Sequence, residues 1–154
     1  MRYFTRHWYN TLQELDRAID IPPPWSDRIL ELWADLPHES YLAYLDTIRQ
    51  HLDDTMRSLI ASSPCQWHDA RMLGTERWGE HLTILLEDHL ARARYHRTVG
   101  ITFEDVSRFS GAEGLEGQYV LYDELLLNTD KTLEYSLLLD RAELSVCCRS
   151  VAFN

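Results

Sequence analysis

The chain of 154 residues is long enough for one domain and too short for two independent hydrophobic cores. Its 5 Trp, 8 Tyr and 4 Phe exclude an intrinsically disordered chain, because so much aromatic surface must be buried. The formal net charge of −10 disfavours binding to nucleic acids and to anionic membranes, and it makes a basic protein the expected partner.

The first two thirds of the sequence predicts helices. Thr5 is suited to cap the first of them, and apolar residues then recur at helical spacing as far as Ile19. Pro37 is expected to end the second helix, and Gly74 is expected to precede the fourth. The predicted helices cover residues 5–19, 26–36, 39–59 and about 75–94.

From about residue 97 the hydrophobic period changes from 3.6 to 2, which is typical of strands. Val99, Ile101 and Phe103, for example, alternate with small or polar residues. The segment 102–109 has a second interpretation, because residues 102–105 also fit the capping box of a short helix. The predicted strands cover residues 99–104, 119–127, 133–139 and 144–148.

Together these segments predict an α+β fold with about four N-terminal helices packed on a C-terminal antiparallel meander of three to four strands. We expect a single domain over residues 1–154. Its helical part would span about 5–95 and its sheet part about 97–154.

The seven histidines are the first place to look for metal chemistry. On the predicted fourth helix His89 and the following His96 fall on the apolar stripe, while His81 lies about a right angle away. No H-E-x-x-H spacing accompanies them, so we expect structural histidines and no metal or other cofactor. The His68–Asp69 dipeptide also occurs in helical phosphohydrolases, but its short connecting segment favours a polar turn. The alternative function is a helical metal-dependent hydrolase that takes its ligands from His38, His51, His68, Asp69, His81 and His89.

The cysteines favour a reducing compartment. Their number is odd, and neighbouring residues of a strand point to opposite faces, so Cys147 and Cys148 are not expected to bridge each other. Cys65 stands three residues before His68, but no third group orients this pair, and we assign no catalytic residue. No apolar leader segment is visible at the N-terminus, so we expect a cytoplasmic protein.

Asp123 and Glu124 interrupt an apolar strand, where carboxylates are disfavoured. One interpretation places one carboxylate in solvent and the other at a bulge or an edge that blocks aggregation. The other interpretation is an acidic face, continuous with Glu113 and Glu116 of the preceding loop, that docks a basic partner. On the second interpretation the protein is an immunity or antitoxin-like inhibitor of a basic, toxin-like effector, bound through Glu113, Glu116, Asp123 and Glu124.

Two short patches carry a resemblance to a known family. The opening Met1-Arg2-Tyr3-Phe4-Thr5, followed by Trp8-Tyr9, resembles the start of an uncharacterised bacterial family whose members begin Met-Lys/Arg-Tyr-Phe-Thr and then carry Trp-Tyr. The segments 120–124, 137–140 and 143–144 are similar to that family's strand-rich end. The family has no assigned activity, so the resemblance implies no functional residues.

Overall fold

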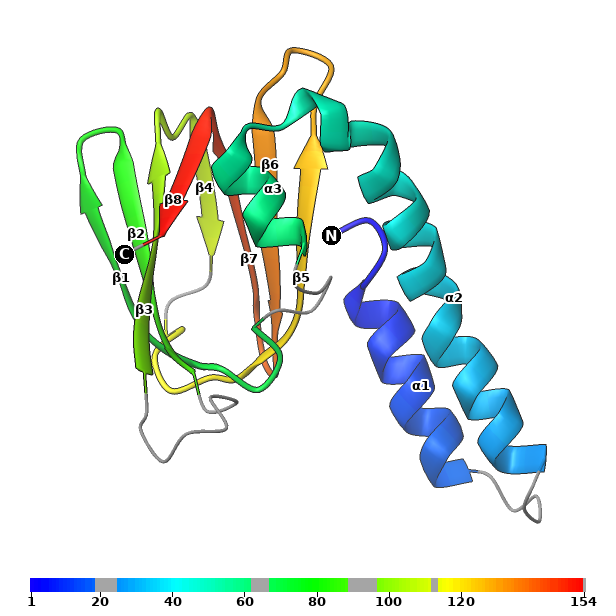
Figure 1. Ribbon diagram of the computed structural model, residues 1–154. Coiled ribbons are helices and arrows are strands. Elements are labelled where there is room, and N and C mark those ends of the chain that lie inside the picture. The colour runs from blue at the N-terminus through cyan, green and yellow to red at the C-terminus, as the bar shows by residue number, and fades with distance from the viewer. Residues whose placement is uncertain (19–24, 62–66, 89–96, 112–113, 154) are drawn as a thin grey trace.

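The computed structural model describes residues 1–18, 25–61, 67–88, 97–111 and 114–153 (Figure 1). Helices occupy the N-terminal part of the described chain, and strands follow from Arg71 onward. The helices are α1 (Arg6–Ala18), α2 (Trp25–Ile48), the 3-10 helix η1 (Arg49–His51) and α3 (Asp54–Ala61). The strands are β1 (Arg71–Trp78), β2 (His81–Asp88), β3 (Arg97–Glu104), β4 (Arg108–Gly111), β5 (Val120–Leu127), β6 (Leu133–Leu139), β7 (Glu143–Cys148) and β8 (Ser150–Phe153).

The described strands form two antiparallel four-stranded sheets, with the orders β1-β2-β3-β8 and β4-β7-β6-β5. The expected α+β fold is therefore wrong. The predicted meander exists as β5-β6-β7, but a whole second sheet faces it. The expected helical part over about 5–95 is wrong as well, because the strands begin at Arg71.

A β-hairpin, β1–β2, stands where a helix over 75–94 was expected. Gly79, with φ at +59°, opens its two-residue turn, as glycine does in turns that match the twist of the strands. Leu82, Ile84 and Leu86 alternate along β2, and all three are buried. The helical interpretation left Ile84 off its apolar stripe, whereas a period of 2 places it in the core. The predicted residues 89–94 lie outside the described residues.

The N-terminal cap was predicted correctly, but the helix boundaries that follow were not. The Thr5 hydroxyl accepts a hydrogen bond from the Trp8 N–H at 3.1 Å, which caps α1. Pro37 lies inside α2 and does not end it. The helix continues because Tyr41, the first residue fully buried beyond the proline, begins a stripe that packs on the sheets.

The segment predicted as one helix over 39–59 is broken after Ile48. A new helix, α3, begins with its own cap, since the Asp53 carboxylate accepts from the Met56 N–H at 2.8 Å. Met56 and Ile60 of α3 are buried, and the helix lies between β8 and β5 in Figure 1. The third helix therefore packs on the common core beside β8.

The strands predicted after residue 97 are confirmed as β3, β5, β6 and β7. The capping-box interpretation of 102–109 is wrong, because β3 continues to Glu104 and β4 begins at Arg108. Alternate residues from both sheets meet in one core, where the centroids of the Phe103 and Tyr135 rings lie 5.4 Å apart. The pleat thus sets which residues face inward.

The two sheets are joined at one corner. The Met72 N–H donates to the Gln118 carbonyl at 2.7 Å, and the Gly117 N–H donates to the Met72 carbonyl at 2.8 Å. Just beyond, Val120 exchanges hydrogen bonds with residues 69 and 70. Within the described chain, none of the helices combines the length and the apolar character needed to cross a bilayer.

Candidate functional site

Glu124 holds the N-terminal segment against β5. Its carboxylate accepts hydrogen bonds from the backbone N–H groups of Arg2 at 2.6 Å, Tyr3 at 2.6 Å and Phe4 at 2.5 Å. The side chain is 0% exposed, so these three donors replace the water that a carboxylate otherwise binds. Glu124 is therefore an anchor for the segment Met1–Thr5.

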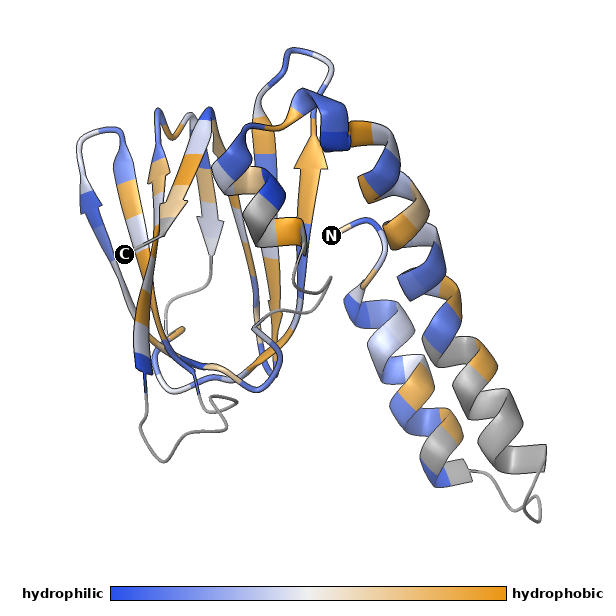
Figure 2. Cartoon of the chain, viewed as in Figure 1, coloured by the Kyte–Doolittle hydropathy of each residue, from blue (hydrophilic) through white to orange (hydrophobic). Residues whose placement is uncertain are grey.

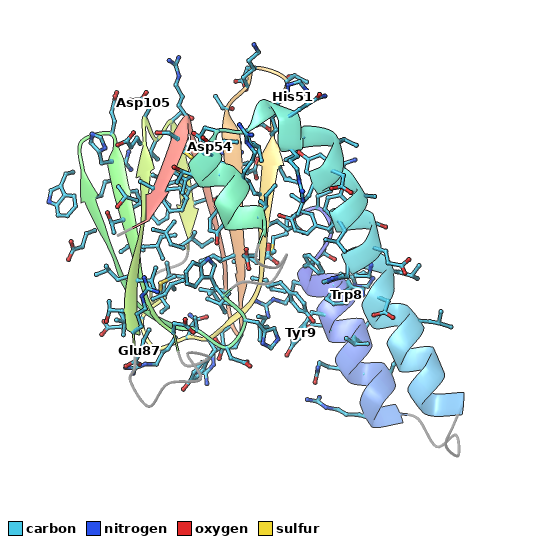
Figure 3. The ribbon with its side chains drawn as sticks, in the orientation of Figure 1. Trp8, Tyr9, His51, Asp54, Glu87 and Asp105 are labelled. Atoms are coloured by element: carbon cyan, nitrogen blue, oxygen red, sulfur yellow. The ribbon has the colours of Figure 1, made fainter. Side chains whose placement is uncertain are left out.

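Aromatic rings extend this anchor. Phe4 stacks on Tyr122 with ring centroids 4.7 Å apart, and Trp8 meets the same ring at 5.2 Å. Tyr9 also contacts Tyr122, and Figure 3 shows Tyr9 on the side of α1 that faces the sheets. The two patches that carry the family resemblance, the opening segment and 120–124, thus touch each other.

Two tyrosines of α2 cover the outer edge of β5. The Tyr41 hydroxyl accepts from the Leu125 N–H at 2.6 Å, and the Tyr44 hydroxyl accepts from the Leu127 N–H at 2.7 Å. Burial raises the pKa of Tyr41 well above its ordinary range, so this hydroxyl stays protonated even above pH ~10. An edge strand that would otherwise offer free N–H groups is closed in this way.

Asp123 points to the opposite face of β5 from Glu124 and is also buried, with 5% of its surface exposed. Its carboxylate accepts a hydrogen bond from the backbone N–H of Trp67 at 3.5 Å. Burial, and after it the charge of Asp123, raises the pKa of the core residue Tyr135. Both carboxylates of the pair therefore act inside the fold.

These positions separate the four residues predicted to bind a partner. Glu116 is exposed in the turn before β5, Glu113 lies outside the described residues, and Asp123 and Glu124 are inside the protein. The pair cannot belong to an exposed acidic face. Its other interpretation is correct that β5 is an edge strand, but the bulge lies between Val120 and Tyr122 and neither carboxylate faces solvent.

The described histidines of the alternative hydrolase lie on separate elements: His38 in α2, His51 in η1, His68 in the turn before β1 and His81 at the start of β2. The turn predicted at His68–Asp69 is confirmed, and the two side chains meet at 3.0 Å. Among the described residues no three side chains of the metal-binding types gather into one site. His89, His96 and Cys65 lie outside the described residues.

Cys147 and Cys148 are free and point to opposite faces of β7, as their adjacency predicts. Burial raises the pKa of the Cys148 thiol to about 12, which makes it a poor nucleophile. On the outer face Arg108 donates to the Cys147 sulfur at 3.0 Å and to Glu134 at 3.2 Å.

An acidic and aromatic surface that the sequence pattern did not predict lies at one end of the first sheet. Trp78 is 61% exposed and stands on the edge strand β1, two residues after the exposed Glu76 and so on the same face. The Val106 N–H donates to the Glu80 carbonyl at 2.8 Å, which brings the turn after β3 beside the β1–β2 turn. We call this surface the Trp78 patch; it consists of Glu76, Trp78, Glu80, Glu104 and Asp105.

In Figure 3, Asp105 and Glu87 lie at opposite ends of the first sheet. The acids of the Trp78 patch are all exposed, whereas Glu87 is half-buried and pairs with Arg71 at 2.8 Å. The available signal was Gly79-Glu80, a glycine-containing pair just before residues 82–86, whose apolar positions also fit a strand. A helix over 75–94 would have placed Trp78 on the face opposite to Glu76 and Glu80, so the helical prediction did not group them.

One comparison with known proteins gives a match. A family model described as "Protein of unknown function (DUF4085)" matches residues 25–148, which run from the first residue of α2 to the last residue of β7. No curated protein matches the chain. The opening segment lies outside the matched range, so its motif adds nothing to this assignment. Because the match covers most of the chain, the protein belongs to this uncharacterised family, DUF4085.

Proposed function

We propose that the protein is a non-enzymatic inhibitor of the immunity or antitoxin type that binds a basic partner protein through the Trp78 patch. The exposed indole of Trp78 among four exposed acids is the observation that carries this proposal. The proposed compartment is the cytoplasm, where thiols such as those of Cys147 and Cys148 stay reduced.

The chemistry of the patch suits a cationic surface. Tryptophan is enriched among the residues that dominate binding energy, because it offers a large apolar area with few rotatable bonds. Glu76, Glu80 and Asp105 around it would steer a basic protein, in keeping with the net charge of −10. The neighbouring Arg77 lies on the other face of β1, and its guanidinium donates to the Gly79 carbonyl at 3.3 Å.

The acidic loop stays a second possible contact for the same partner. Glu116 is exposed and Glu113 precedes it by three residues, so these two carboxylates keep the role first expected of them. Asp123 and Glu124 drop out of the proposed interface because both are buried. A variant that removes Glu124 would disturb folding and is unsuitable for testing the interface.

The test measures binding to the product of the adjacent reading frame by surface plasmon resonance, from about 50 to 500 mM salt. We expect the association rate to fall as salt rises, because steering is screened. Trp78→Ser should weaken the affinity about tenfold or more. The double variant Glu76→Gln with Glu80→Gln should reduce both the association rate and its dependence on salt.

Glu113→Gln with Glu116→Gln removes the same charge from the loop, and we expect it to weaken binding less than the substitutions in the Trp78 patch. Glu14→Gln with Glu39→Gln is the matched control, since both residues are exposed on the helices and belong to neither surface. Loss of binding in the loop variant, with none for Trp78→Ser, would move the interface to the loop and contradict the Trp78 patch. Affinity that does not respond to salt would contradict the electrostatic mechanism. If the adjacent gene product does not bind, the inhibitor assignment fails.

A further inference from the structure

A cavity of about 440 Å³ lies at the end of the molecule where the β5–β6 turn meets η1 and α3. Its lining combines basic and apolar side chains, namely His51, Lys131, Arg149, Met56, Leu127 and Leu133. Figure 3 shows His51 beside this turn. A volume of this size is within the range of small-molecule sites in proteins.

The cations of this cavity stand out against an acidic chain. Lys131 is the one lysine of the sequence, and in the described part of the chain neither Lys131 nor Arg149 takes part in an ion pair. Charges without a partner beside an apolar wall are suited to an anion that also carries an apolar group.

The acids nearby are engaged with other donors. Asp53 lines the cavity, but its carboxylate caps α3 through the Met56 N–H. Asp130 accepts from the Thr132 N–H at 3.0 Å and from the Thr132 hydroxyl at 2.7 Å. These two bonds, and to a lesser degree the charge of Arg149, lower the pKa of Asp130.

Arg149 is shared between two cavities. It also borders a neighbouring cavity of about 360 Å³ that contains Glu80 and Asp105. Those two acids weaken the electrostatic attraction between Arg149 and an anion. Lys131 lines the larger cavity and not the smaller one, so it is the cation that sets the two cavities apart. The turn at Asn128 supplies further polar groups there.

The backbone of Lys131 gives an independent reason to assign it a role. Its φ is +66°, in the left-handed region where glycine or asparagine is favoured over residues with long side chains. The turn is closed by the Lys131 N–H to the Asn128 carbonyl at 3.0 Å and the Asn128 N–H to the Thr132 carbonyl at 2.8 Å. A lysine at such a position costs stability and is expected where its ammonium group is used.

We infer that this cavity binds a small organic phosphate, with the phosphate group held by Lys131 and Arg149 and the organic group packed on Met56, Leu127 and Leu133. Arg149 can donate two parallel hydrogen bonds to phosphate oxygens, and Lys131 adds a compact positive charge. The inference goes beyond the proposed function and does not depend on any protein partner.

The test uses phenyl phosphate as the probe, measured by isothermal titration calorimetry on the full chain. We expect a Kd of about 1 mM or tighter, with weaker binding of inorganic phosphate, because that ion lacks the apolar contacts. Absence of phenyl phosphate binding at about 10 mM overturns the inference. Benzoate bound as well as phenyl phosphate overturns the assignment to phosphates.

Lys131→Gly separates binding from folding. It should raise the unfolding temperature by about 3 °C, because glycine accepts the left-handed backbone, and it should weaken phenyl phosphate binding at least about tenfold. Lys131→Asn, which also tolerates this backbone, should weaken binding equally. Arg141→Gln is the control, since Arg141 is exposed and away from the cavity. Unchanged binding in both Lys131 variants overturns the inference.

Discussion

Each sheet has an edge strand that carries acidic residues, namely β5 and β1. The edge of β5 is covered by other segments, whereas that of β1 is exposed. On β5, hydroxyls of α2 accept the N–H groups of Leu125 and Leu127, and the buried Glu124 binds the N-terminal segment. On β1, the residues Thr75 to Trp78 are exposed at the edge of their sheet. Figure 2 shows the same contrast, with hydrophobic colour along β5 and hydrophilic colour at the arrowhead of β1.

This contrast shows that the sequence position of an acidic residue on a strand does not decide whether its carboxylate is buried or exposed. Glu124 and Glu76 both lie on edge strands, yet one is 0% exposed and the other is on the surface. The difference lies in the donors around them, because three backbone N–H groups surround Glu124. A buried carboxylate with such donors stabilises the fold, whereas an exposed one is available for a partner.

The largest expected effect comes from breaking the closed edge at its anchor. Glu124→Gln keeps the shape but replaces three charge-assisted hydrogen bonds, so the free energy of unfolding should fall by about 3 kcal/mol. Urea titration measures this loss, and hydrogen exchange at residues 2–4 should become faster. Glu76→Gln is the matched control on the open edge and should change stability by less than about 0.5 kcal/mol. Equal effects of the two substitutions would contradict the comparison.

Removing one hydroxyl should open the same edge to a smaller extent. Tyr41→Phe leaves the buried Leu125 N–H without its acceptor, and we expect a loss of about 2 kcal/mol. Tyr44→Phe should cost less, because Tyr44 is only half-buried and water can reach Leu127. Urea titration of both variants checks this order, and a larger effect of Tyr44→Phe would show that burial does not set the cost.

The closed edge and the core behind it should also make the protein sensitive to alkaline pH. The pKa values of Tyr41 and Tyr135 are raised in the folded state. Above pH ~10 these hydroxyls therefore ionise in the unfolded chain but not in the folded one, which stabilises the unfolded state. Stability should therefore fall with rising pH, by about 1.4 kcal/mol per pH unit for each of these tyrosines. Cys148, whose pKa is raised to about 12, adds a loss of the same sign.

Urea titrations at several pH values between about 9 and 11 measure this slope. The Tyr41→Phe variant sharpens the assignment, because it should remove one tyrosine's share of the slope while leaving that of Tyr135. Stability that stays constant across this range would show that the two hydroxyls are not held protonated by the fold.

The sequence by itself determined the strands after residue 97, the cap at Thr5 and the turn at His68–Asp69. Each of these depends on neighbours in the chain: a strand with one buried face alternates, and a cap needs only its own first turn. The opposite directions of Cys147 and Cys148 follow from the same pleat.

Only the tertiary structure decided the hairpin β1–β2, the continuation of α2 through Pro37 and the burial of Asp123 and Glu124. The leucines of β2 fit both a helical period of 3.6 and a strand period of 2. The strand forms because it also places Ile84 in the core. The donors to Glu124 stand 120 to 122 residues before it in the chain. From sequence alone a charged residue is expected on the surface. The hydrogen-bond donors that allow it to be buried come from distant segments, and the local pattern does not show them.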